Sequence, residues 1–265
     1  MWEKSAGLSR VRESCAEAIG SGLKSWSTSK LREGDTRFCG IWEVVRHIPG
    51  WFEEINAAAI FKVLAEVKPQ RVVEIGSYMG RSTVFFGLSL LTLQNGGRVT
   101  AIDPHSGDRQ QREKFGMAEI PSFEVFRTHI RIAGVEQAID PILATSTEVA
   151  KSWTEPFEFL FVDGWHSYDA VLADGREWVP KMAEGGVAVF DDALQYEEVR
   201  HAIADLNREG TINLWGHFWG QAYAGRSHTP PRSVQELLVA GRGEKLAHWA
   251  NGLKFLDSER KPAVG

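Results

Sequence analysis

Short apolar runs alternate with longer amphipathic stretches from Arg71 onward. Runs rich in Val, Ile and Phe that end at polar residues are typical of buried strands, and apolar residues at helical spacing are typical of the helices that cover them. The predicted strands are 71–75, 98–103, 138–143, 157–163 and 186–192, followed by strand-like residues at 212–223. The predicted helices are 82–91, 123–133, 168–178 and 197–208. This alternation predicts an α/β fold with a parallel sheet and helices on both faces.

The pattern differs on either side of this alternating region. Upstream, the apolar residues of 51–67 have helical spacing, and the predicted helix stops before Pro69 because proline disfavours helix at the preceding residue. Residues 1–36 are rich in Ser, Gly and charge, with one helical stretch at 11–19. Downstream of 228 we expect one amphipathic helix at 234–238 and a polar tail.

Composition narrows the class of protein. The 265 residues are 43% hydrophobic and carry a formal net charge of −5, without the clustered Lys and Arg that a nucleic-acid-binding face needs. No apolar run approaches the length of a membrane span, and the amino-terminal residues are too polar for a secretory signal. Cys15 and Cys39 lack metal-type spacing and indicate free thiols in a reducing compartment. We therefore expect a cytoplasmic protein that binds neither nucleic acid nor membrane.

A glycine-rich loop lies where the first predicted strand turns into the first helix. Gly76 and Gly80 have GxxxG spacing rather than the GxGxxG of dinucleotide folds, and no GK[ST] follows, which disfavours NAD and the P-loop route to ATP. Asp103 ends the second strand, where an acid can accept hydrogen bonds from both hydroxyls of a ribose. Each feature alone is explained by a turn. Together, on neighbouring strands, they favour an adenosine ligand.

Three carboxylates follow two later strands. Asp163 ends the strand 157–163, and Asp191 with Asp192 ends the strand 186–192. Because parallel strands bring their carboxyl ends to one edge of a sheet, the three acids are expected to converge there. Several carboxylate oxygens in one cleft suit a hard cation such as Mg²⁺. The alternative is that Asp191 and Asp192 only cap the helix that follows them.

These motifs resemble a known family. The loop ExGxxxGxS followed by an acid after the second strand looks like class I S-adenosylmethionine-dependent methyltransferases. The run DGxHxYxxVxxDxxxWxxxxxxGGxxxFDD, here at 163–192, is similar to the metal-dependent branch with the macrocin and mycinamicin sugar O-methyltransferases. Catechol O-methyltransferase is a more distant relative. The resemblance covers about 49–207 and implies a Rossmann-like, seven-stranded, mostly parallel sheet whose last strand is antiparallel.

The resemblance assigns roles to individual positions. The residues implied to bind the cofactor, S-adenosyl-L-methionine, are Glu74, Gly76, Ser77, Tyr78, Gly80, Ser82, Asp103 and Ser146. Among these, Asp103 is expected to hold the ribose, and Ser146 is expected near the adenine. The implied metal ligands are Asp163, Asp191 and Asp192. The last of these positions is an amide in the catechol relatives and an acid in the sugar branch, as it is here.

His166 is the candidate catalytic base. It lies three residues after Asp163, so one turn can direct both side chains to the same volume. Histidine titrates near neutrality, and a neutral hydroxyl must lose its proton to attack a methyl sulfonium. The sugar-modifying relatives carry a histidine at this place, and the catechol relatives carry a lysine. The alternative is that His166 caps the following helix or satisfies a local carbonyl group, while Asp169 and Asp174 on that helix are expected to be solvated.

The expected function is Mg²⁺-dependent O-methylation of a sugar or sugar-containing metabolite. Rival interpretations are methylation of a phenol or catechol, a cephalosporin hydroxylase-like oxygenase, and a cofactor-binding partner without turnover. The oxygenase is disfavoured because mononuclear iron usually takes two histidines and one carboxylate. Tryptophans near the predicted strand ends, such as Trp165, Trp178, Trp215 and Trp219, belong either to the core or to the wall of an acceptor pocket.

The domain organisation follows from the same boundaries. Residues 1–48 are expected to be an amino-terminal extension that forms a lid or an oligomer contact. Residues 49–227 are the expected methyltransferase domain, and 228–265 are the carboxyl-terminal helix and tail. Apolar surface on the extension and on the Trp-rich segments favours a homo-oligomer.

Overall fold

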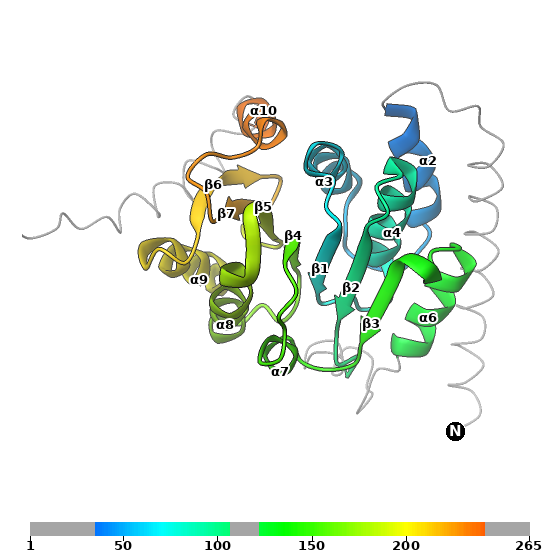
Figure 1. The fold of residues 1–265 in the computed structure, drawn as a ribbon, viewed down its shortest axis with the longest axis horizontal. Coiled ribbons are helices and arrows are strands. Elements are labelled where there is room, and N and C mark those ends of the chain that lie inside the picture. Colours follow the sequence, from blue (N-terminus) through cyan, green and yellow to red (C-terminus); the bar gives the residue numbers. More distant parts are fainter. Residues whose placement is uncertain (1–34, 107–121, 242–265) are drawn as a thin grey trace, which may run out of the picture.

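The computed structural model describes residues 35–106 and 122–241. They form a seven-stranded sheet with the order β3-β2-β1-β4-β5-β7-β6 (Figure 1). The strands are β1 (Arg71–Ile75), β2 (Arg98–Ile102), β3 (Ile139–Ile142), β4 (Phe157–Val162), β5 (Met182–Phe190), β6 (Asn213–Phe218) and β7 (Gln221–Gly225). The first five strands run parallel, and β7 is antiparallel to both β5 and β6. The predicted fold, including its antiparallel last strand, is confirmed.

Helices cover both faces of the sheet (Figure 1). The helices are α2 (Asp35–Val45), α3 (Glu54–Val67), α4 (Arg81–Leu93), α6 (Ser122–Ile132), α7 (Ser146–Ala150), α8 (Tyr168–Trp178), α9 (Glu197–Arg208) and α10 (Arg232–Gly241). One core cluster joins α2, α3, α4, α6 and α10 to one face, and a second joins α7, α8 and α9 to the other. The two clusters place every helix on a definite side of the sheet.

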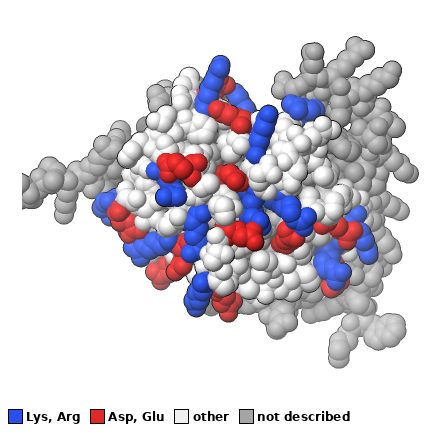
Figure 2. Space-filling view, in the orientation of Figure 1, with Lys and Arg blue, Asp and Glu red and all other residues white. Residues whose placement is uncertain are grey.

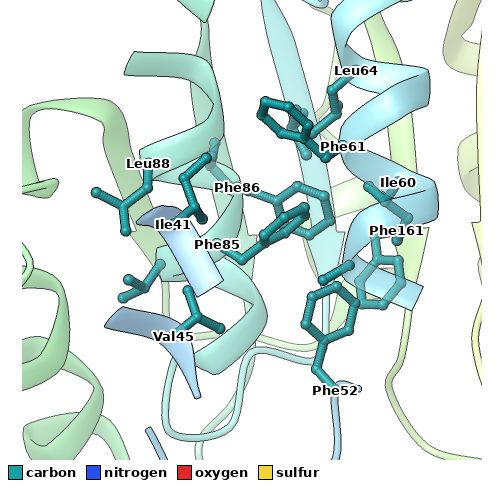
Figure 3. Packing of buried hydrophobic residues seen from close by; sticks show 14 of the residues in the cluster. Ile41, Val45, Phe52, Ile60, Phe61, Leu64, Phe85, Phe86, Leu88 and Phe161 are labelled. Atoms are coloured by element: carbon teal, nitrogen blue, oxygen red, sulfur yellow. The ribbon is translucent and has the colours of Figure 1, made fainter. Parts of the chain in front are cut away.

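The strands divide their side chains between these two clusters. Val72 belongs to the first cluster and Val73 to the second, and Phe161 and Leu160 divide in the same way. This alternation explains why the strands have nearly continuous apolar sequences, since neither face is solvated. In the first cluster Phe86 packs edge-on against Phe161 with ring centroids 5.4 Å apart (Figure 3).

Helix α2 contributes to the same core although its residues lie in the predicted amino-terminal extension. Ile41, Val44 and Val45 are fully buried, and α2 packs against α4. Figure 3 shows Ile41 and Val45 beside Leu88 of α4. The extension up to residue 34, and the tail beyond residue 241, lie outside the described residues.

The surface of the described part carries charges of both signs. On the face drawn in Figure 2, Lys and Arg side chains are interspersed with Asp and Glu. Within residues 35–106 and 122–241, no helix combines the length and apolar character needed to cross a membrane.

Candidate functional site

The glycine-rich loop joins β1 to α4 in a tightly confined turn. Gly76 and Gly80 both have positive φ angles, 86° and 88°. A Cβ atom on Gly76 would lie 2.1 Å from the carbonyl oxygen of Asp163, the residue after β4. A Cβ on Gly80 would lie 2.9 Å from the ring of Phe126. Glycine is therefore required at 76 for both its conformation and the close approach of another backbone.

Asp103, the residue after β2, lies directly beside this loop. Its Oδ2 accepts hydrogen bonds from the backbone N–H groups of Ser77 and Tyr78, at 2.9 and 2.8 Å. Its Oδ1 accepts from the N–H of His105 at 2.6 Å. The two features that the sequence placed on neighbouring strands are therefore in contact, and the Asp103 carboxylate organises the loop in addition to its predicted role toward a ribose.

Helix α6 supports the loop from the other side. His129 is 1% exposed, and its Nδ1 lies 2.6 Å from the carbonyl oxygen of Met79. His105 lies between the loop and α6, with Nε2 3.5 Å from the Ser77 hydroxyl and Nδ1 2.9 Å from the Ser122 hydroxyl. Sequence reasoning missed His129, because a single histidine within a predicted helix carries no motif.

Glu74 on β1 is a fully buried acid behind the loop. Its Oε2 accepts a hydrogen bond from the Thr83 hydroxyl at 2.5 Å, whereas its buried Oε1 has no partner within the described residues. Burial raises the pKa of Glu74 to about 8, and the nearby charges of Asp163 and Asp103 add to the increase. A buried carboxylate oxygen without a donor suits a cationic ligand group.

The amino terminus of α4 offers the complementary charge. Its N-cap residue is Gly80, which has no side chain to bond the first N–H groups. Such groups favour a carboxylate, and helix polarity adds to the attraction. With Glu74 nearby, the loop fits the ammonium and carboxylate of a methionine-type ligand.

The strand ends of β4 and β5 bring together the second group of predicted residues. Ligand atoms of Asp163, His166 and Asp192 all lie within 4.8 Å of one another. His166 Nε2 is 3.0 Å from Asp192 Oδ2 and 3.7 Å from Asp163 Oδ1. The His166 ring stacks on Tyr196, with centroids 4.3 Å apart and an interplanar angle of 11°. Such a group of one imidazole and two carboxylates can hold a metal ion.

Asp191 lies beside this group but is not among its converging ligand atoms. Its side chain is 9% exposed and its Oδ1 accepts a hydrogen bond from the N–H of Asp192 at 3.0 Å. Of the three predicted metal ligands, the structure therefore brings Asp163 and Asp192 together with His166. We call Asp163, Asp191 and Asp192 the carboxylate cluster.

Like charges strain the carboxylate cluster. Burial raises the pKa of Asp163 to about 6, with the Asp192 charge adding to it. The pKa of Asp191 is raised well above its usual range by burial and by the charges of Asp163 and Asp192. Burial lowers the pKa of His166, but its hydrogen bonds to Asp163 and Asp192 raise it to about 10. Without another cation, the imidazole is protonated at neutral pH and offsets part of the negative charge.

Helix capping does not account for these residues. Helix α8 is capped by Ser167, whose hydroxyl accepts from the N–H of Ala170 at 3.3 Å. The N-cap residue of α9 is Tyr196, four positions beyond Asp192. The alternative that His166, Asp191 and Asp192 serve as helix caps is therefore wrong.

Residues 73–193, which run from β1 to just after β5, match a family model described as a methyltransferase domain. Over these residues the chain is similar to methyltransferases. The seven-stranded sheet and its antiparallel last strand agree with the class I fold that the resemblance in sequence implied. The family match therefore supports the methyltransferase interpretation of the sequence.

Solved structures of the same fold lie far from this domain in sequence. The SAH-bound methyltransferase PaMTH1 of Podospora anserina is 13% identical with a TM-score of 0.54, and the match covers 76% of this chain and 92% of that one. The O-methyltransferase NovP is 15% identical with a TM-score of 0.54, covering 67% of this chain and 83% of NovP. At these identities the likeness shows the fold.

A curated protein of Sinorhizobium fredii, named "Uncharacterized protein y4gI", is similar in sequence. It is 27% identical over an alignment of 175 residues, and the match covers 60% of this chain. The chain spans only 18% of the length of y4gI.

One predicted residue of the methyltransferase domain lies in an unexpected environment. Ser146 begins α7, and its hydroxyl donates a hydrogen bond to Asp174 of α8. Asp174 is only 4% exposed, and burial raises its pKa to about 6. The prediction that Asp174 is solvated is therefore wrong, while Asp169 on the same helix is exposed as expected.

The tryptophans of the domain differ in their burial. Trp178 is fully buried in the second core cluster. Trp165, between Asp163 and His166 in sequence, is 59% exposed. A flat apolar surface of this kind beside the carboxylate cluster can pack against a cyclic ligand.

Proposed function

We propose that the chain transfers a methyl group from S-adenosylmethionine to a hydroxyl of a sugar or sugar-containing metabolite, with Mg²⁺ bound beside the cofactor. One observation supports this most directly. The Asp163 carbonyl is in such close contact with the loop that a Cβ at Gly76 would lie 2.1 Å from it. A methyl donor on the loop and an acceptor at the carboxylate cluster would therefore occupy adjoining space.

The cofactor part of the proposal assigns the loop and its neighbours. Glu74 would face the cationic methionine end, and the amino terminus of α4 would face its carboxylate. Asp103 would accept hydrogen bonds from the ribose hydroxyls, and Ser146 would lie near the adenine. The cofactor supplies an activated methyl group on a sulfonium, whose positive charge matches the excess of carboxylates around Glu74 and Asp163.

The metal part of the proposal assigns the carboxylate cluster. Asp163, Asp191 and Asp192 offer the oxygen ligands that Mg²⁺ prefers, and the raised pKa values of Asp163 and Asp191 indicate negative charge that a cation would relieve. Bound Mg²⁺ would lower the pKa of an acceptor hydroxyl and fix its direction.

His166 is the proposed base, with Nε2 as the atom that takes the acceptor proton. Nε2 faces Asp192 at 3.0 Å, and the stacked Tyr196 ring fixes the plane of the imidazole. The raised pKa of His166 opposes this role while both carboxylates face it alone. Once those oxygens are shared with a divalent cation, repulsion between the positive charges would lower that pKa toward the range useful for a base.

A sugar acceptor is proposed from the sequence signature at 163–192 together with the exposed Trp165. Pyranose rings pack well on flat aromatic surfaces, and vicinal hydroxyls can share a metal ion. Catechols also have a flat ring and vicinal hydroxyls, so catechols and other phenols remain the alternative acceptors. The test must therefore compare both classes.

Methyl transfer from labelled S-adenosylmethionine to a panel of sugars, nucleotide sugars and catechols tests the proposal. We expect turnover with Mg²⁺, its loss in chelator and its recovery when Mg²⁺ is restored. Asp163→Ala and Asp191→Asn should each lower turnover by about 100-fold or more, because an open metal site loses its ligands. Glu198→Gln, an exposed change in α9, is the matched control and should keep wild-type turnover.

Two results would contradict the proposal. Full turnover of Asp163→Ala in chelator would exclude the metal role, and transfer to nitrogen or carbon acceptors alone would exclude O-methylation. Cofactor binding is measured separately by calorimetry, so loss of turnover with intact binding locates the defect in the carboxylate cluster.

A further inference from the structure

The glycine-rich loop is held through its own peptide groups by side chains from outside it. Asp103 accepts from the N–H groups of Ser77 and Tyr78, and His129 contacts the carbonyl oxygen of Met79. Gly80 then donates its N–H to the Ser77 carbonyl at 2.7 Å, which closes the turn before α4. Two separate elements, the end of β2 and helix α6, therefore hold neighbouring peptide groups of one short turn.

The geometry of His129 defines which group is the donor. A carbonyl oxygen can only accept, so Nδ1 must carry the proton that bonds to Met79 at 2.6 Å. Burial lowers the pKa of His129, which keeps the ring neutral, and its Nε2 is buried without a partner within the described residues. The His129 ring therefore has its proton on Nδ1, and the hydrogen bond that it donates within the described residues is to the loop.

The loop conformation needs such support. Tyr78 has a φ of 45°, in the left-handed region that a residue with a side chain adopts only at a cost. Such a conformation persists when surrounding contacts over-determine it. The Tyr78–Met79 peptide is the one between the Asp103 contacts and the His129 contact, so its orientation depends on both.

We propose that His129 is a positioning residue for the methyl donor: by donating to the Met79 carbonyl from α6 it holds the glycine-rich loop in its ligand-binding conformation. The proposal rests on the cofactor role of this loop given above. His129 acts through the loop and contacts the donor at no point. Removing its N–H leaves a carbonyl without its donor and lets the Tyr78 peptide relax away from the strained conformation.

Calorimetric titration of S-adenosylhomocysteine into the full-length chain tests this without any acceptor. The amide nitrogen of asparagine and Nδ1 of histidine are both bonded to Cγ, so His129→Asn keeps a donor in the right place. His129→Leu fills similar volume without a donor. We expect His129→Asn to bind within about threefold of wild type and His129→Leu to bind about tenfold more weakly.

A matched control separates positioning from general stability. Ile130→Val removes one methylene from the next buried residue of α6 and should lower the urea midpoint without changing the affinity. Hydrogen exchange adds a second readout, since amides of 76–83 should exchange faster in His129→Leu and not in Ile130→Val. If His129→Leu does not fold, His129→Gln takes its place, because its amide is displaced by one bond from the Nδ1 position.

The outcomes are distinct. Equal affinity of His129→Leu and wild type, or equal loss in His129→Asn and His129→Leu, would overturn the positioning role. Absence of binding by the wild-type chain would instead contradict the proposed function on which this inference rests. A specific loss in His129→Leu with recovery in His129→Asn is the result expected.

Discussion

The glycine-rich loop and the carboxylate cluster lie side by side at one edge of the sheet but are stabilised in opposite ways. The peptide groups of the loop are bound by two side chains from outside it, Asp103 and His129. The carboxylate cluster gathers negative charge that the protein relieves only in part, through His166. The peptide groups of the loop therefore have hydrogen-bond partners without a ligand. The carboxylate cluster instead carries negative charge that a bound cation would neutralise.

The difference follows from what each element supplies. Asp103, the residue after β2, accepts hydrogen bonds from N–H groups of the loop. His129, on α6, donates one to a carbonyl oxygen of the loop. The ends of β4 and β5 provide acids on adjacent strands, and the ion pairs that Asp163 and Asp192 make within the described residues are with His166. Substitutions in the loop should therefore lower the free energy of unfolding. Substitutions in the carboxylate cluster should change how that free energy depends on pH.

The largest effect is expected from Gly76→Ala, which breaks the contact between the two regions. The new Cβ would meet the Asp163 carbonyl at 2.1 Å on a backbone with φ of 86°, so we expect a loss of about 4 kcal/mol or more in the free energy of unfolding. Gly134→Ala is the control, because φ is 70° there but nothing lies within 4 Å of its Cβ. It should cost only about 1 kcal/mol in the same urea titration. Equal losses would show that backbone conformation alone matters at Gly76.

An intermediate effect is expected in the pH dependence of stability. The pKa of Asp163 rises from 3.8 to about 6 on folding, so the folded chain holds that proton more tightly than the unfolded chain does. Asp163 should therefore contribute a fall of about 2 kcal/mol in the free energy of unfolding between roughly pH 4 and pH 6 in chelator. Asp163→Asn cannot ionise and should make the fall over this range smaller by that amount, as judged from urea titrations at several pH values. An unchanged slope in Asp163→Asn would contradict the predicted strain in the carboxylate cluster.

A smaller effect is expected at Asp174, where burial acts without neighbouring acids. Its pKa is raised to about 6 by burial, while the Ser146 hydroxyl lowers it. Asp174→Asn keeps an acceptor for that hydroxyl and removes the charge, so it should stabilise the chain by about 1 kcal/mol near pH 8 and not near pH 5. Thermal unfolding at the two pH values measures this. A loss of stability at both pH values would show that the Ser146 hydroxyl needs a charged acceptor.

Periodicity was sufficient to predict the elements that set the fold. The strand 71–75 and the helices 168–178 and 197–208 were predicted with the boundaries of β1, α8 and α9. The fold could be predicted because apolar runs buried on both faces, separated by amphipathic helices, allow few arrangements. The stretch 212–223 is less informative, since it divides into β6 and β7 at Trp219 and Gly220, whose positive φ angles no apolar pattern indicates.

The candidate site was predictable where acids directly follow neighbouring parallel strands. Asp163 and His166 follow β4 and Asp192 follows β5, and the three converge as expected. His129 and Asp174 were out of reach, because each lies within a helix and contacts a partner from another element, Met79 or Ser146. A polar residue in an amphipathic helix has the same local pattern whether it faces water or a buried partner, and only the packing distinguishes the two cases.

The burial of α2 bears on how such a domain can be exchanged between proteins. Residues 73–193 carry the family likeness, but Ile41, Val44 and Val45 of α2 are packed into the core beneath α4. The stretch that matches the family is therefore shorter than the folded unit. A recombination that moved residues 73–193 alone would leave the apolar surface of α4 uncovered, so α2 would have to be transferred with them.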